Sequence, residues 1–76
     1  MAAKRQHEIR RGLIKVRIRQ RKSNFTSGYT VSVVRLYRNG SEWKESARFE
    51  RDDIPLIRLV LDEAYTWILS RGGELE

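Results

Sequence analysis

The sequence predicts an α+β fold in which a curved four-stranded antiparallel sheet is followed by one C-terminal helix, in the order β-β-β-β-α. Apolar and charged residues alternate over residues 13–22, which is typical of a strand with one buried face. Asn39-Gly40 is a strong hairpin-turn signal between two β-rich segments. After residue 53 the apolar period changes from 2 to 3.6, which indicates a helix.

The strand predicted over residues 13–21 separates apolar from cationic side chains. Ile14, Val16 and Ile18 fall on one side and predict a core face. The side chains that fall on the opposite side are those of Lys15, Arg17, Arg19 and Arg21. A strand rise of about 3.3 Å per residue spaces these cations by about 6 to 7 Å. Such a row suits a long polyanion, so we expect nucleic acid as the partner.

Two further strands are expected before the hairpin turn. Residues 8–11 form a short first strand that bends at Gly12, because an isolated glycine in a strand often marks a kink. Residues 23–28 read as a loop, and residues 29–38 as the third strand. Val33 and Val34 interrupt its alternation, so either both faces are covered there or a bulge swaps the register. We favour the bulge, which turns Arg35 and Tyr37 to the cationic side.

The fourth strand is predicted over residues 41–50. It places Trp43, Ala47 and Phe49 on one face, so that Lys44 and Arg48 share the cationic side. Trp43 is expected to pack in the core or an interface. Charge kept on an exposed sheet face for solubility and against edge pairing is the alternative explanation for these cations.

The helix is predicted over residues 54–69, with Asp52 as its N-cap and Gly72 near its end. Its apolar residues exceed the stripe that one sheet can cover, so a second buried surface is implied. A homodimer supplies that surface most simply. The residues that we expect at the dimer interface are Leu59, Val60, Tyr65, Trp67 and Ile68.

Length and composition predict one small domain over residues 8–71, between a basic tail (1–7) and a C-terminal tail (72–76). The 76 residues include no cysteine, so disulfides cannot support the fold. The net charge of +6 is uneven, because residues 4–38 hold eleven Lys or Arg and one acidic residue. The chain has no secretory or membrane-spanning segment, so we expect a cytoplasmic protein, with nucleoid association as an option.

The sequence shows no catalytic constellation. His7 is the only histidine, and Asp52 and Asp53 are better explained by helix capping than by acid–base chemistry. A phosphate loop and a nucleophile elbow are also absent. We therefore expect no enzyme, no cofactor, no metal and no small-molecule substrate.

Three segments resemble the single-stranded-DNA-binding domain of the transcriptional coactivator positive cofactor four family, as a short, bacterial-type member. They are residues 8–18, 29–43 and 49–54, within a likeness that spans residues 8–70. The resemblance implies a homodimer whose helices meet across the dimer and whose curved sheets hold unpaired DNA through basic and aromatic residues. By position, it implies such roles for Arg17, Arg19, Arg21, Tyr37, Lys44 and Arg48. The loop at residues 23–28 looks longer than the family's usual turn.

We therefore expect a homodimeric single-stranded-nucleic-acid-binding protein of low sequence specificity, preferring DNA to RNA and acting in transcription or DNA maintenance. The alternatives are an adaptor whose basic sheet docks an acidic protein, and an RNA or duplex DNA binder. The expected contact residues are Lys15, Arg17, Arg19, Arg21, Lys22, Phe25, Arg35, Tyr37, Lys44 and Arg48. Among them, Tyr37 and Phe25 are expected to stack on bases.

Overall fold

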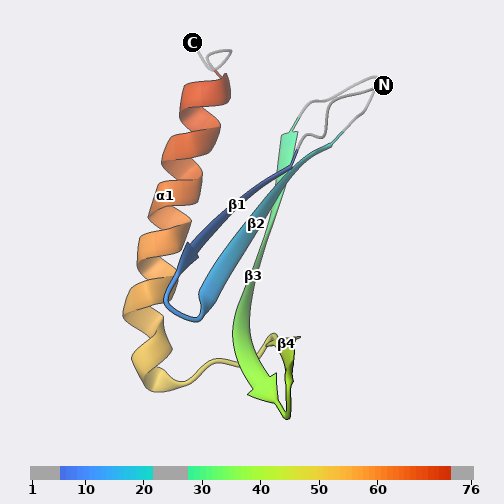
Figure 1. Ribbon diagram of the computed structural model, residues 1–76. Coiled ribbons are helices and arrows are strands. Elements are labelled where there is room, and N and C mark those ends of the chain that lie inside the picture. The colour runs from blue at the N-terminus through green and yellow to red at the C-terminus, as the bar shows by residue number, and fades with distance from the viewer. Residues whose placement is uncertain (1–5, 22–27, 73–76) are drawn as a thin grey trace, which may run out of the picture.

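The computed structural model describes residues 6–21 and 28–72 and confirms the predicted fold class, a four-stranded antiparallel sheet followed by one helix. The strands lie in the sheet in chain order, and the helix packs against one face of it (Figure 1). The elements are β1 (Gln6–Arg11), β2 (Ile14–Arg21), β3 (Gly28–Asn39), β4 (Glu42–Ser46), a 3₁₀ turn (Arg51–Asp53) and α1 (Ile54–Gly72).

A two-residue turn joins β1 to β2, where a bend in the chain was expected. Arg11 pairs with Ile14, so Gly12 and Leu13 alone form the connection. Gly12 has a φ of 61°, in the left-handed region that favours glycine. The first two strands are therefore a tight antiparallel hairpin, and β1 begins at Gln6.

The core lies between β2 and α1, as the alternation predicted. Ile14, Val16 and Ile18 are fully buried, and they pack with Val60 and Ala64 of the helix. The helix lies mainly over β2 and β1 and touches β3 less. We call the sheet face that packs on α1 the inner face and the opposite one the outer face.

Strand β3 runs without the bulge that we favoured at Val33 and Val34. Its pairing with β2 is continuous from residue 28 to residue 35, and its pairing with β4 continues from 35 to 39. Both valines are half-buried on opposite faces of the sheet. The favoured bulge is therefore wrong, and β3 keeps its alternation through both valines.

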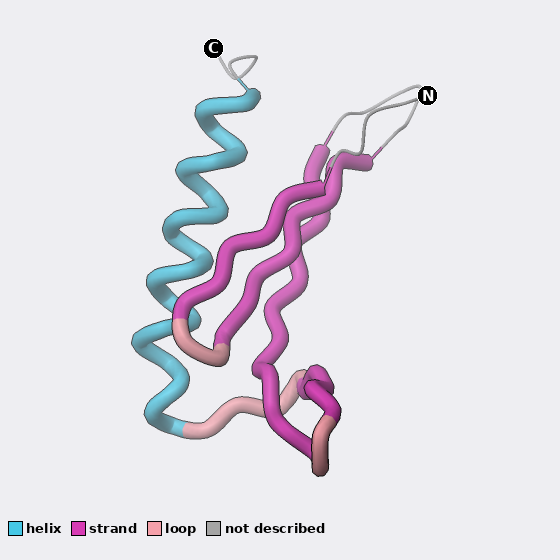
Figure 2. The backbone as a smooth tube through the Cα atoms, in the orientation of Figure 1, coloured by secondary structure: helices cyan, strands magenta, loops and turns pink. Residues whose placement is uncertain are grey.

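The third strand extends past the ends of β1 and β2, and β4 pairs with that extension and with Arg35 at its start (Figure 2). The turn between them is Gly40-Ser41, with Gly40 at a φ of 69°. β4 ends at Ser46, four residues earlier than predicted, because the chain then leaves the sheet to reach the helix.

The helix start is built differently from the prediction. The Asp53 carboxylate, and not that of Asp52, caps the turn by accepting a hydrogen bond from the Glu50 backbone N–H at 2.8 Å. Asp52 instead pairs with Arg51 at the surface. Asp53 also lies 3.4 Å from Arg35 Nε, which ties the start of the helix to β3.

One side of α1 leaves apolar residues uncovered. Ile54, Leu61, Tyr65 and Leu69 are all exposed, and Tyr65 is 61% accessible. At 3.6 residues per turn they form one stripe beside the core-facing residues. In the described part of the chain no helix is long and apolar enough to cross a membrane.

Candidate nucleic-acid interface

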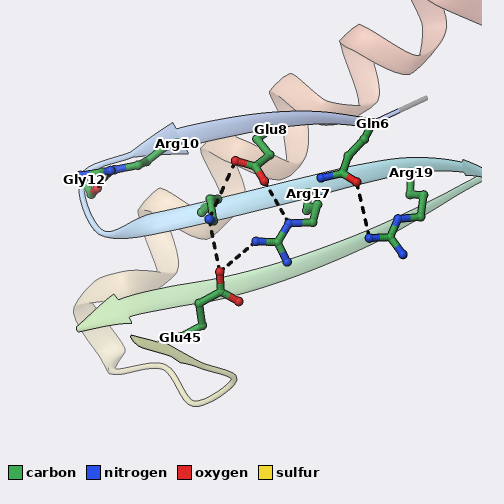
Figure 3. Close-up of polar contacts among 8 residues, drawn as sticks. Gln6, Glu8, Arg10, Gly12, Arg17, Arg19 and Glu45 are labelled. Atoms are coloured by element: carbon green, nitrogen blue, oxygen red, sulfur yellow. Dashed lines mark hydrogen bonds and ion pairs between the residues drawn. The ribbon is translucent and has the colours of Figure 1, made fainter. Parts of the chain in front are cut away.

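The outer face of the sheet carries most of the strand cations. Figure 3 shows this face with the helix behind it and the labelled side chains toward the viewer. Strand pairing assigns its members, since directly paired residues share a face. Among the described residues, its charged members are the cations Arg10, Lys15, Arg17, Arg19, Arg21 and Arg38 and the carboxylates Glu8 and Glu45.

At one end of this face, Arg19 and Arg21 form no ion pair with any described residue. Arg19 donates only a long hydrogen bond of 3.5 Å to Gln6 Oε1. The residues opposite it on β3 are small, and a hollow of about 280 Å³ lies there, lined by Arg17, Arg19, Thr30 and Ser32. This end offers guanidinium donors and space for an anion.

In the middle of the face, two carboxylates hold Lys15 and Arg17 in a ring. Arg17 donates from Nε to Glu8 Oε2 at 3.1 Å and from one terminal nitrogen to Glu45 Oε2 at 2.8 Å. Lys15 Nζ lies 3.2 Å from Glu45 and 3.9 Å from Glu8. We call these four residues the carboxylate ring. β1 and β4 therefore each contribute one acid to the side of the sheet that the sequence predicted as cationic.

Contacts within the carboxylate ring shift the pKa values of Arg17 and Glu45. The hydrogen bonds to Glu45 and then to Glu8 raise the pKa of Arg17 above its ordinary value. The Arg17 guanidinium, followed by the Lys15 ammonium, lowers the pKa of Glu45 below its ordinary 4.5. Both groups are therefore more firmly charged than in isolation.

At the other end of the face, Arg38 lies over the Trp43 ring, with its Cζ 5.4 Å from the ring centroid. The two residues are cross-strand partners, and Trp43 is 55% accessible. Trp43 therefore does not pack in the core of the single chain, and its place in an interface stays a prediction. An exposed indole beside a guanidinium is a surface on which a base can stack.

Three predicted contact residues face the other way. Because no bulge interrupts β3, Arg35 lies on the inner face, where it contacts Asp53 and the Arg48 carbonyl oxygen. Tyr37 alternates to the same side, and Lys44 is its cross-strand partner. Lys44 pairs there with Glu42 at 3.5 Å. None of these three joins the cationic row.

The remaining predicted contacts fall outside the sheet or outside the description. Arg48 follows the end of β4, and its backbone N–H donates to Ser46 Oγ at 3.0 Å. Lys22 and Phe25 lie outside the described residues.

Sequence reasoning missed Arg10, Arg38 and Trp43 on the outer face. The Asn39-Gly40 signal predicted the hairpin but not its register, because the two-residue turn is Gly40-Ser41 and makes residue 38 the partner of residue 43. Strict alternation from Ser32 would have placed Arg38 and Trp43 on the same face as the cationic row of β2. The assumed bulge reversed the assignment.

The residues predicted at the dimer interface fall into two groups, those packed within the chain and those exposed on it. Val60 is fully buried on its own sheet, and Ile68 packs against the same core. Trp67 stacks on His7 with ring centroids 4.5 Å apart. Only Leu59 and Tyr65 are exposed, at 42% and 61%, and thus available to a partner.

We predict that the Glu45 carboxyl titrates below pH 4.5 and that Arg17→Gln moves its pKa back toward that value. Because folding depresses this pKa, the ring stabilises the fold above about pH 4.5, and the contribution is lost as pH falls through the folded-state pKa. Carboxyl ¹³C NMR titration measures the shift, with Arg51→Gln as the control that leaves Glu45 unchanged. An unshifted Glu45 in the wild-type protein would contradict the ring.

Comparison with known proteins gives no match to a family model, a curated protein or a solved structure. Among the described residues, no three acidic or histidine side chains lie close enough to hold a metal ion.

Proposed function

We propose that this protein binds single-stranded nucleic acid, DNA in preference to RNA, on the outer face of its sheet and with little sequence specificity. One observation carries the proposal: the sheet face opposite α1 brings together six described cations and one exposed indole against two carboxylates. Transcription or DNA maintenance is the setting that the family resemblance suggests.

The arrangement of the cations supports a polymer as the ligand. Lys15, Arg17, Arg19 and Arg21 occupy alternate positions of one strand, so they form a row with a spacing of about 6.6 Å at the usual strand rise. Each contact with a phosphate releases counterions, and a row of contacts adds these gains along a chain. A small anion could use only one or two of them.

The exposed Trp43 favours an unpaired strand over a duplex as the ligand. Bases in a duplex are already stacked on each other, whereas a single strand can lay a base on the Trp43 ring. Such stacking is worth about 1 to 3 kcal/mol per base and does not depend on base identity. The preference for DNA follows only the resemblance to the positive cofactor four family.

We predict that Arg19→Ala weakens binding to oligo-dT about fivefold at 0.1 M salt and reduces the salt slope by about 0.7, the loss of one phosphate contact. Arg51→Ala removes the same charge from the 3₁₀ turn, away from the outer face, and is expected to have little effect. Fluorescence anisotropy at several salt concentrations measures both, beside duplex DNA and RNA of equal length. No wild-type binding to oligo-dT at low salt would sink the proposal and leave the protein adaptor as the better explanation.

We predict that Trp43→Ala costs about 1 to 3 kcal/mol of binding to single-stranded DNA, because it removes the stacking surface. Tyr37→Ala is the matched control, since Tyr37 lies on the inner face beside the same turn. Competition titration with a labelled oligonucleotide compares the two variants. An equal loss in both would mean that Trp43 does not stack.

We further propose that the protein acts as a homodimer through the uncovered stripe of α1. The stripe of Ile54, Leu61, Tyr65 and Leu69 continues the core surface toward β3, where Val31 is also exposed. Arg58 and Asp62 lie beside Leu61 in a hollow of the same helix face. In a two-fold antiparallel pairing of the helices centred at the level of residue 60, each Arg58 faces the Asp62 of the other copy, so the surface complements itself.

We predict that Leu61→Glu converts the dimer to a monomer, because it places a charge at the centre of the apolar stripe. Thr66→Glu changes the opposite flank of the helix, next to β1, and is expected to leave the dimer intact. Sedimentation equilibrium measures both variants. A wild-type monomer at high micromolar concentration would contradict the proposed assembly.

A further inference from the structure

The carboxylate ring occupies the donors that a bound strand would need most. Arg17 uses Nε for Glu8 and a terminal nitrogen for Glu45, so two sites of its guanidinium fork are already filled. Lys15 is shared between the same two carboxylates. These two cations lie in the middle of the cationic row, between the Arg38–Trp43 pair and Arg19, which forms no ion pair with a described residue.

The chemistry of the ring resembles that of a phosphate contact. A carboxylate and a phosphodiester both present two anionic oxygens to a guanidinium, and both form charge-assisted hydrogen bonds of about 2.7 to 2.9 Å. The 2.8 Å contact between Arg17 and Glu45 falls in that range. The acids come from β1 and β4, which flank the cations from two sides.

From this geometry we propose that Glu8 and Glu45 are intramolecular competitors of the nucleic-acid backbone, which hold Lys15 and Arg17 until a strand displaces them. The inference rests on the proposed function and adds a regulatory contact to the same surface. Arg19 and Arg21 are exposed and contact the first phosphates of the strand. Lys15 and Arg17 then exchange their contacts with Glu8 and Glu45 for contacts with the next phosphates. The carboxylates thereby lower the affinity for short or weakly charged anions.

Exposure of the ring fits such an exchange. The side chains of Glu8 and Glu45 are 43% and 39% accessible, so water can take over their solvation when they are released. Lys15 and Arg17 are less exposed, at 18% and 26%, and stay on the sheet. Since an exposed pair contributes little net stability, the exchange does not require the fold to open.

The test is the isosteric double substitution Glu8→Gln with Glu45→Gln. It leaves the shape of the ring but removes the competing charges, so binding to oligo-dT is expected to tighten about tenfold at 0.1 M salt. Glu42→Gln with Asp52→Asn is the matched control, because it changes net charge equally and touches neither Lys15 nor Arg17. The gain is expected to shrink when Arg17→Gln is added to the first variant, because only Lys15 of the two held cations then remains to contact the strand.

The outcomes separate the two proposals. If both double variants tighten binding equally, net charge alone explains the gain and the competition is refuted, while the proposed function stands. If neither the wild type nor any variant binds, the proposed function itself is refuted. Carboxyl ¹³C NMR of wild-type Glu45 gives a second measurement that does not depend on the variants folding. Its resonance is expected to shift toward that of a free glutamate on saturation with oligo-dT, and an unchanged resonance in the saturated complex overturns the competition.

Discussion

The strict alternation of β2 is the constraint on which the rest of the structure depends. One side of this strand supplies the three fully buried residues Ile14, Val16 and Ile18, and its other side supplies four cations. A slip of one residue against either neighbour would exchange the two sides and bury charge against Val60. The tight turn at Gly12 and the continuous pairing with β3 therefore protect the core and the outer face together.

Ion pairs arrange the side chains of the outer face, as apolar packing arranges those of the inner face. The carboxylate ring divides the cationic row into an open end at Arg19 and Arg21 and an aromatic end at Trp43. A sheet face charged only for solubility would not need an exposed indole beside an arginine. The combination suits a ligand that carries both phosphates and flat rings, and single-stranded nucleic acid is such a ligand.

Local patterns in the sequence predicted the fold well, and long-range geometry limited the prediction of the site. The alternation around Val16 and the period change after Asp53 depend only on neighbours in the chain, so they could be recognised directly. The face of Tyr37 depends on whether a strand of twelve residues keeps its register, which Val33 and Val34 leave ambiguous in sequence. The ring was not predictable because its acids come from β1 and β4, far apart along the chain.

Arg35 is the one residue of β3 that pairs with both neighbouring strands, with Ile14 on one side and Ser46 on the other. Its guanidinium holds the start of α1 on the inner face, while Glu45, the next residue of β4, is held by Arg17 on the outer face. The β3–β4 hairpin is therefore held by ion pairs on both faces of the sheet, through Arg35 of β3 and Glu45 of β4. While both contacts hold, a tilt of the hairpin would also pull on the first turn of the helix.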